Sequence, residues 1–448
     1  MIKERLIDLT KKIGLDKSIA YSSGARVVQG VFGLITVLVI SMTLSKEEQG
    51  YYYTFGSIIA IQVFFELGLT NIIMQFTGHE MAGLSLSEGT TLSGEKANLS
   101  RISSLLHFSV KWYGVAALLF VLVTIIAGFI FFSKYPQGDG HEWVFPWILV
   151  CIATGISLFI SPIMSILMGL GMVKEVSRIR FYQQVAGPIL SWILLFSGAK
   201  LSVLGYGTLF ASLLLVAMMY RDKLLSLLIN IWRTKIEERV SYIKEIFPFQ
   251  WKIAISWISG YFVVQIFNPV LFATEGAVVA GQMGMTLTAF NSISAFSQSW
   301  VTTKIPEFSR LIALKNYIKL DSLFNVTLKQ MAYVTLFLIV AFIGLLELMK
   351  VLDIPLRERF LPMLPIILMA VSIFISGYVN AWSIYLRCHK KEPLLLYSIV
   401  TGVLCCISTF VFGSLWGVIG ITAGYFGVIA ITSIWAYIIF KTKKLSWH

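Results

Sequence analysis

The sequence, 448 residues long, contains little charge. Asp, Glu, Lys and Arg make up 13% of it, whereas hydrophobic residues make up 57%. A soluble domain is near half apolar and about a quarter charged, so a chain of this composition cannot cover its apolar side chains with its own polar surface. The composition therefore excludes a soluble protein and predicts an integral membrane protein.

Residues that carry catalytic or metal chemistry are also few. Three of the four cysteines (Cys151, Cys405 and Cys406) lie in apolar runs and Cys388 lies in a loop, so neither a disulfide framework nor a CxxC metal pair is present. None of the five histidines lies in the middle of an apolar run, and no Walker loop for ATP is found. We therefore expect no enzyme, no metal site, and no cofactor beyond a coupled H⁺ or Na⁺ ion.

Twelve apolar runs are long enough to cross a bilayer, which takes about 20 residues of helix. The runs are too long and too uniformly apolar for the strands of a barrel. The sequence thus predicts an all-α, polytopic membrane helix bundle. The expected spans are 19–45, 51–77, 112–133, 145–168, 182–199, 202–220, 253–274, 279–303, 331–349, 362–386, 394–413 and 418–440.

The net charge of +13 would suggest a nucleic-acid partner in a soluble protein. With the N-terminus placed inside, 29 of the 36 Lys and Arg residues lie on the cytoplasmic side, six lie outside, and Arg26 lies within the first span. Such an asymmetry is the usual signal of orientation in a membrane. We therefore expect both termini in the cytoplasm, and no nucleic-acid partner.

The second half of the chain partly repeats the first. Residues 157–161 (SLFIS) match residues 372–376 (SIFIS), and 203–205 (VLG) match 418–420 (VIG) at the same offset. Two six-helix halves of equal orientation imply a two-fold axis along the membrane normal, with a site between the halves. The expected division is an N-terminal segment (1–18), a first lobe (19–220), a cytoplasmic linker (221–252), a second lobe (253–440) and a tail (441–448).

Only two ionisable residues lie well inside the spans, and such residues are costly in a membrane unless they have a function or a partner. At 1.5 Å per residue, Arg26 lies about 10 Å and Glu66 about 16 Å from the inner boundary. One interpretation is a structural salt bridge between spans 1 and 2. The other places Arg26 in a cavity facing an anionic substrate, with Glu66 as its counter-ion or as a titratable coupling site. The residues alone leave both open.

Neutral polar residues extend this pattern. Span 8 carries polar side chains at steps of three and four, which places them on one helical face, and span 2 carries a similar stripe around Glu66. Because spans 2 and 8 are counterparts in the repeat, we expect the two stripes to face each other across a water-filled cavity. The candidate residues are Gln62, Glu66, Thr70, Thr288, Asn291, Ser294 and Gln298.

Three segments of the chain resemble one family of membrane transporters. Residues 44–53 (LSKEEQGYYY), followed by Phe64–Leu69 (FFELGL), resemble the opening of Wzx-type polysaccharide flippases, members of the multidrug/oligosaccharidyl-lipid/polysaccharide exporter superfamily. Residues 304–311 (KIPEFSRL) are similar to that family's Pro-x-x-Ser-Arg-Leu segment, and 415–420 (LWGVIG) to its Gly-x-x-Gly entry into the last helix. Their order and spacing cover essentially the whole chain.

The resemblance implies a flippase of the bacterial inner membrane. Such a protein moves an undecaprenyl-diphosphate-linked oligosaccharide to the outer leaflet by ion-coupled alternating access, for O-antigen or similar glycan synthesis. Its partners would be the lipid-linked substrate, membrane lipids, and the polymerase and chain-length proteins of the pathway. By this resemblance, Arg26 would be the family's basic residue in the first helix, and Glu66 its acidic residue in the second. The second half lacks a deep basic residue, and Lys304 and Arg310 lie at its inner mouth instead.

Other classes fit less well. A drug/cation antiporter of the same superfamily shares the scaffold and is the main alternative. A major-facilitator transporter would carry a short basic motif between spans 2 and 3, whereas residues 78–111 are long and rich in Ser and Gly. A glycan polymerase or ligase would need a large outside loop, which the spans do not leave room for.

The expected topology can be tested by cysteine labelling in intact cells. In a background without the four native cysteines, Gly138→Cys should react with a membrane-impermeant maleimide and Lys235→Cys should not, because they lie on opposite sides of the membrane. Both should react after permeabilisation, and labelling of Lys235→Cys in sealed cells would contradict the orientation.

Overall fold

The computed structural model describes residues 17–87, 90–136, 142–389 and 391–447, with side chains from Val28 onward apart from those of Gln29, Ser87 and Phe249. These residues are nearly all helical, so the prediction of an all-α chain is confirmed. Residues 84–94 form a small antiparallel hairpin, in which Leu84 pairs with Gly94 and Ser87 with Thr91. The expected N-terminal segment lies mostly outside the described residues.

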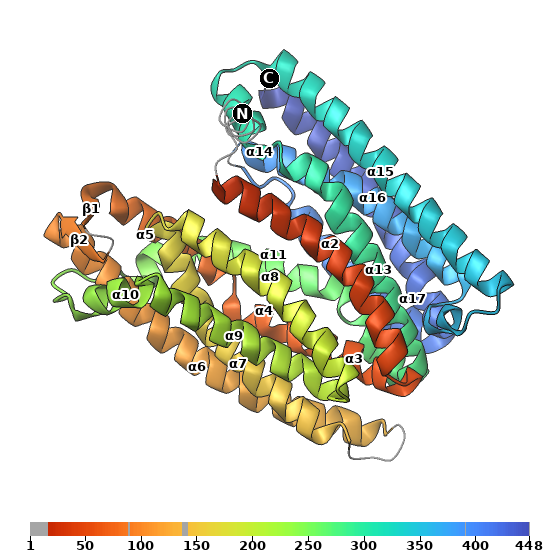
Figure 1. Cartoon of the computed structure of the whole chain (residues 1–448). Coiled ribbons are helices and arrows are strands. Elements are labelled where there is room, and N and C mark those ends of the chain that lie inside the picture. The colour runs from red at the N-terminus through yellow and green to blue at the C-terminus, as the bar shows by residue number, and fades with distance from the viewer. Residues whose placement is uncertain (1–16, 88–89, 137–141, 390, 448) are drawn as a thin grey trace, which may run out of the picture. The chain divides into compact units, whose positions relative to one another are not determined.

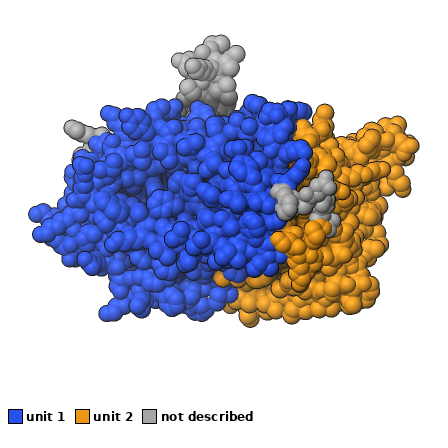
Figure 2. Space-filling model, turned by 90° about the horizontal axis from the view of Figure 1, so that it is seen from below, with its two compact units in different colours: residues 1–25, 61–131, 141–257 blue, residues 26–60, 132–140, 258–448 orange. Residues whose placement is uncertain are grey.

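The described chain divides into two compact units, which Figure 2 shows in separate colours. The first comprises residues 1–25, 61–131 and 141–257, and the second comprises residues 26–60, 132–140 and 258–448. The linker expected at 221–252 is thus part of the first unit. The division into two sequence-related lobes stays a prediction.

The first unit contains most of the elements from the second to the seventh expected span, and Figure 1 labels its α-helices and strands. They are α4 (Val63–Glu66), α5 (Leu69–Glu80), η2 (Met81–Gly83), β1 (Leu84–Ser87), β2 (Thr91–Gly94), α6 (Lys96–Lys134), α7 (Val144–Gly169), α8 (Val173–Phe196), η3 (Lys200–Ser202), α9 (Val203–Arg221), α10 (Leu224–Arg233), η4 (Tyr242–Ile246) and α11 (Phe247–Val264).

The second unit contains the remaining helices, of which α15, α16 and α17 run side by side in Figure 1. They are α2 (Lys17–Thr43, from Arg26 onward), α3 (Lys46–Ile59), α12 (Phe267–Thr274), α13 (Ala277–Thr302), α14 (Ile305–Ala313), α15 (Tyr317–Val351), η5 (Pro355–Arg359), α16 (Met363–Cys388) and α17 (Leu395–Trp447). The division between the units falls within the short segment η1 (Ala60–Gln62).

Each expected span coincides with helical residues. Not every one of these helices is long and apolar enough by itself to cross a membrane. Among the described residues, seven helices are long and apolar enough to cross a membrane, or eight if the bent pair Lys46–Glu66 and Leu69–Gly83 is one span.

The long helix α17 contains two expected spans, divided at Gly417, where φ is 54° and ψ is −136°. The carboxylate of Glu275 accepts the backbone N–H of Val418 at 3.0 Å and so caps the second part. The count of twelve spans and their topology stay predictions.

The start of α3 follows directly from its sequence. Ser45 accepts the backbone N–H of Glu48 at 3.0 Å, and the Glu48 carboxylate accepts the backbone N–H of Ser45 at 2.8 Å. This reciprocal pair is a capping box, which satisfies two N–H groups that a helix end leaves free. The Ser-x-x-Glu motif of residues 45–48 is thus explained by the capping of α3.

Glycines bring α3 and α13 into close contact within the second unit. A Cβ atom at Gly50 would lie 2.0 Å from the carbonyl oxygen of Ala277, and one at Gly284 would lie 2.2 Å from the Cβ of Tyr53. Beside them, the buried Gln49 donates to the carbonyl oxygen of Gly281 at 2.8 Å. In lipid, where apolar burial does not drive helices together, such close backbone approach and interhelical hydrogen bonds supply the association energy.

Gly50→Ala should therefore lower the thermal stability of the detergent-solubilised protein. The added methyl group overlaps the backbone of α13, and overpacking of this kind costs about 1–3 kcal/mol. Gly56→Ala is the matched control on the same helix, because a Cβ there meets nothing within 4 Å. The control should be neutral or slightly stabilising, and equal melting temperatures for the two variants would contradict the contact.

Candidate functional site

The second expected span is broken in its middle. It passes from α3 through η1 into α4, which ends at Glu66, and the chain resumes as α5 after Leu67 and Gly68. Both residues between the helices are left-handed, with φ of 49° at Leu67 and 65° at Gly68. The helices on either side are bent by 41°. Broken helices of this kind lie at substrate and ion sites in membrane transporters.

The chain is tightly packed at the break, with no room for a larger side chain at Gly68. A Cβ at Gly68 would lie 2.3 Å from Cγ2 of Ile253, so this left-handed position also has no room for a larger residue. Leu67 adopts a left-handed backbone without being glycine, which costs roughly 1–2 kcal/mol. Such strain persists only where the surrounding structure imposes it, and it is concentrated at functional sites.

Glu66 lies directly at this break, as the last residue of α4. Its side chain is half-buried, and no hydrogen bond or ion pair joins it to another side chain in the described ranges. The preceding Phe65 packs edge-on against Phe120 of α6, with ring centroids 5.4 Å apart. The carbonyl groups at the end of a helix lack intrahelical partners and carry partial negative charge. A carboxylate beside them is suited to taking up H⁺ or Na⁺.

Tyr113 of α6 lies close enough to Glu66 for the two side chains to interact electrostatically. Its ring is fully buried, and its hydroxyl lies near the side chain of Ser161 and the backbone of Thr70. We identify Glu66 and Tyr113, together with the break, as the candidate functional site of the first unit.

The expected stripe in span 2 does not lie on one straight helix. Gln62 ends the 3₁₀ segment η1, Glu66 ends α4, and Thr70 lies in the first turn of α5. The regular spacing that we assumed is interrupted because Leu67 and Gly68 turn left-handed. The signal in the sequence is Gly68, since glycine is the residue that adopts this conformation readily.

The expected stripe in span 8 does lie on one continuous helix, α13. Thr288 donates to the carbonyl oxygen of Gly284 at 2.9 Å, and Gln298 donates to that of Gly377 on α16 at 3.0 Å. Asn291 is exposed and Ser294 is half-buried. These residues belong to the second unit and Glu66 to the first, so the expectation that the two stripes face each other stays a prediction.

Three basic candidates remain. The side chain of Arg26 lies outside the described side chains, so its two interpretations both stay open. Lys304 is the N-cap residue of the short helix α14 and Arg310 lies within that helix, and both side chains are exposed. Arg310 pairs with Glu307 at 2.9 Å. Their role at an inner mouth stays a prediction.

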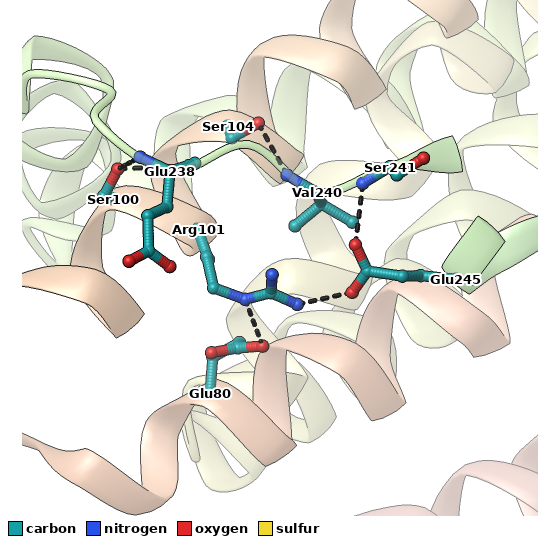
Figure 3. Close-up of polar contacts among 8 residues, drawn as sticks. All are labelled: Glu80, Ser100, Arg101, Ser104, Glu238, Val240, Ser241 and Glu245. Carbon is teal, nitrogen blue, oxygen red and sulfur yellow. Dashed lines mark hydrogen bonds and ion pairs between the residues drawn. The ribbon is translucent and has the colours of Figure 1, made fainter. Parts of the chain in front are cut away.

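The structure also contains a polar cluster that the sequence analysis missed (Figure 3). Arg101 of α6 donates from Nε to Glu80, the last residue of α5, at 2.8 Å, and from Nη2 to Glu245 of η4 at 2.5 Å. The backbone N–H of Ser241 and the guanidinium of Arg101 hold the pKa of Glu245 below its usual range. One arginine thus joins three segments that are far apart in the sequence.

Serines on the same helix hold the linker against the first unit. Ser100 accepts the backbone N–H groups of Glu237 and Glu238, both at 2.8 Å, and Ser103 donates to the carbonyl oxygen of Thr234 at 3.2 Å. Ser104 adds a bond from the N–H of Val240 at 3.3 Å. The serines at steps of three and four form one helical face, a signal that was present in the sequence. They satisfy a linker backbone that forms no regular structure.

Possible metal ligands do not gather in the structure. No group of three or more His, Cys, Asp and Glu side chains within the described ranges could hold a metal ion.

Comparison with solved structures identifies proteins that share the fold of this chain. No protein-family model and no curated protein sequence matches the chain. Among solved structures, the inward closed lipid II flippase MurJ superposes with a TM-score of 0.63 and 14% identity, covering 94% of this chain and 89% of MurJ. An outward-facing multidrug resistance MATE transporter of the MOP superfamily gives 0.60 and 13%, covering 96% of each chain. A mutant of the Vibrio cholerae MATE transporter VcmN gives 0.58 and 14%, covering 96% and 97%.

The chain has the fold of MOP-superfamily transporters. These structural neighbours are transporters and flippases rather than enzymes, and the apolar helices agree with a multi-pass membrane protein. The superfamily is the one to which the sequence motifs pointed. That the chain belongs to the Wzx family in particular stays a prediction.

Glu66 should react with a lipid-soluble carbodiimide, a reagent for protonated carboxyl groups in apolar surroundings. Glu80 should remain unmodified, because Arg101 covers one of its carboxylate oxygens and the side chain is only 8% exposed. Peptide mass spectrometry of the purified protein measures both sites in one sample. Equal modification of the two glutamates, or none at Glu66, would contradict the assignment.

Proposed function

We propose that the protein is a flippase for an undecaprenyl-diphosphate-linked oligosaccharide in the bacterial inner membrane. It carries the repeat unit from the inner to the outer leaflet for the synthesis of O-antigen or a similar surface polysaccharide. The observation that supports this most is the broken second span with Glu66 at the break. That feature occurs in a chain whose fold is shared with a lipid II flippase and whose motifs resemble Wzx proteins.

In this proposal Glu66 couples transport to an ion gradient. Binding of H⁺ or Na⁺ neutralises a carboxylate that is costly in a membrane and that has no described partner. The strained residues Leu67 and Gly68 allow the helices on either side of them to change their angle when that charge is neutralised. Alternating access then follows from a local change of charge next to a joint in the helix.

The substrate brings a diphosphate and a polar oligosaccharide. Arg26 of the first span is the proposed partner of the diphosphate, because a guanidinium offers paired N–H donors to phosphate oxygens and stays charged in an apolar setting. The neutral polar residues of the two stripes provide hydrogen bonds for sugar hydroxyls. Lys304 and Arg310 would attract the anionic substrate to the cytoplasmic entrance. The polymerase and chain-length proteins of the pathway are the proposed partners downstream.

A drug/cation antiporter of the same superfamily is the second candidate. Two of the three structural neighbours reported above are MATE transporters, which share this fold at nearly the same similarity. A half-buried carboxylate such as Glu66 also suits a cationic substrate. The two functions differ in their substrates, so substrate tests separate them.

The proposal can be tested by rescue of surface glycan in a strain that lacks its own flippase. The wild-type chain should restore the glycan, whereas Glu66→Gln and Arg26→Ala should reduce it at least tenfold while membrane insertion is unchanged. Glu142→Gln is the control, because that carboxylate is exposed and its contact with Lys200 is 3.8 Å long. The exchange Arg26→Glu with Glu66→Arg should restore function only if the two residues serve as a structural pair.

Full glycan rescue by both single variants would overturn the role of these residues. Absence of rescue by the wild-type protein, together with resistance to cationic dyes, would favour the antiporter.

A further inference from the structure

A cavity of about 370 Å³ lies beside the cluster of Figure 3, within the first unit. One wall is a face of α5 that carries Ile72, Gln75, Phe76 and His79 at the spacing of a helix. The other wall consists of Glu80, Arg101 and Glu245. The size lies within the range of small-ligand sites, about 300–1,000 Å³. The cavity is separate from the break at Glu66.

The charges around this cavity do not balance. Two carboxylates, Glu80 and Glu245, face one guanidinium, that of Arg101. Glu245 uses both oxygens, one for Arg101 and one for the backbone N–H of Ser241 at 2.8 Å. Glu80 uses only Oε1, and its other oxygen has no partner among the described residues (Figure 3). The cluster therefore has one excess negative charge and one free carboxylate oxygen.

The Glu80 side chain is only 8% exposed, and it lines the cavity. A donor bound in the cavity can pair with this free oxygen, since hydrogen bonds to charged groups contribute about 1.5–3 kcal/mol each. The missing donor should be positively charged, because the cluster is negative. An ammonium group has the required charge and several N–H donors.

The other surfaces of the cavity specify the rest of the ligand. Arg101 forms no hydrogen bond from Nη1 to a described residue, and the ring of His79 lines the same space, so donors are available for a phosphate. Ile72 and Phe76 form an apolar wall. Span 2 is expected to end near residue 77, so this wall lies toward the membrane and Glu80 lies at its cytoplasmic boundary. A ligand that fits has an ammonium, a phosphate and apolar chains.

We propose that this cavity binds an aminophospholipid of the inner leaflet, with its ammonium at Glu80, its phosphate at Arg101 and its acyl chains along Ile72 and Phe76. Such a lipid would complete the contact between α5, α6 and the linker and so stabilise the first unit. The site is independent of the proposed transport function. Soluble phosphoethanolamine has the same charged groups without the chains and is the alternative source that the test must separate.

The test uses the purified full-length protein in detergent, with lipids added singly and binding followed by native mass spectrometry and thermal shift. Phosphatidylethanolamine should bind at least tenfold more tightly than phosphatidylcholine, whose quaternary ammonium has no N–H donor, and than phosphatidylglycerol, which has no ammonium. Soluble phosphoethanolamine at equal concentration should produce no shift. No preference among the three lipids, or an equal shift with phosphoethanolamine, would overturn the proposal.

Two variants locate the site. Glu80→Gln removes the charge that the ammonium needs and should abolish the preference for phosphatidylethanolamine, a loss of about tenfold or more for one charged hydrogen bond. Asp222→Asn is the matched control, because this carboxylate is also mostly buried (14% exposed) and paired with an arginine, Arg178, but lies away from the cavity. It should keep the preference.

Gln75→Trp provides a second variant in case Glu80→Gln folds poorly. Gln75 is exposed at the cavity wall and takes no part in the ion pairs, so a larger side chain should fill the space without disturbing Arg101. It should remove lipid binding while the melting temperature without lipid stays unchanged. An unaltered preference in both variants would contradict the site. Because the measurement is binding, its failure would leave the flippase proposal standing.

Discussion

Within a membrane, each backbone N–H and C=O group needs a partner inside the protein, and most features of this structure depend on that requirement. Helices meet it along their length, which is why the apolar runs are helical. The same requirement makes the interruption at Leu67 and Gly68 expensive, because it leaves carbonyl groups at the end of α4 without intrahelical partners. Glu66 is located at this end. A polar, strained point inside an apolar span is retained where function needs it, and the proposed coupling of transport to an ion depends on it.

The linker satisfies its backbone in a different way. Between α10 and η4 it forms no regular structure, so its N–H and C=O groups are paired by the serine side chains of α6, namely Ser100, Ser103 and Ser104. Arg101, on the same turn of helix, adds two ion pairs. The linker thereby becomes a fixed part of the first unit rather than a loose connection. In an alternating-access cycle, changes of conformation would then arise within helices such as the broken second span.

The helix α5 connects the two sites that we propose. At its beginning lies the break with Glu66, and its last residue is Glu80, which pairs with Arg101. The surroundings of the two carboxylates differ. Glu66 has no described partner, whereas one oxygen of Glu80 accepts a hydrogen bond from the Arg101 guanidinium and the other is free. Their proposed ligands differ accordingly, since a small ion suits the first and a lipid ammonium suits the second. A lipid at the end of α5 near Glu80 would act on the helix that begins directly after the break at Glu66.

The sequence by itself determined the membrane class and the helical fold, and it singled out Glu66 as a candidate. Long apolar runs and a shortage of charge depend only on composition and order along the chain, and the capping box of Ser45 and Glu48 involves neighbouring residues. The motifs also pointed to the superfamily whose fold the structure has. Periodicity could not reveal the break in span 2, because two residues turning left-handed leave the hydrophobic pattern on either side intact. Only the tertiary structure brought Glu80, Arg101 and Glu245 together, since these residues lie up to 165 positions apart and their pairing depends on how α5, α6 and the linker pack.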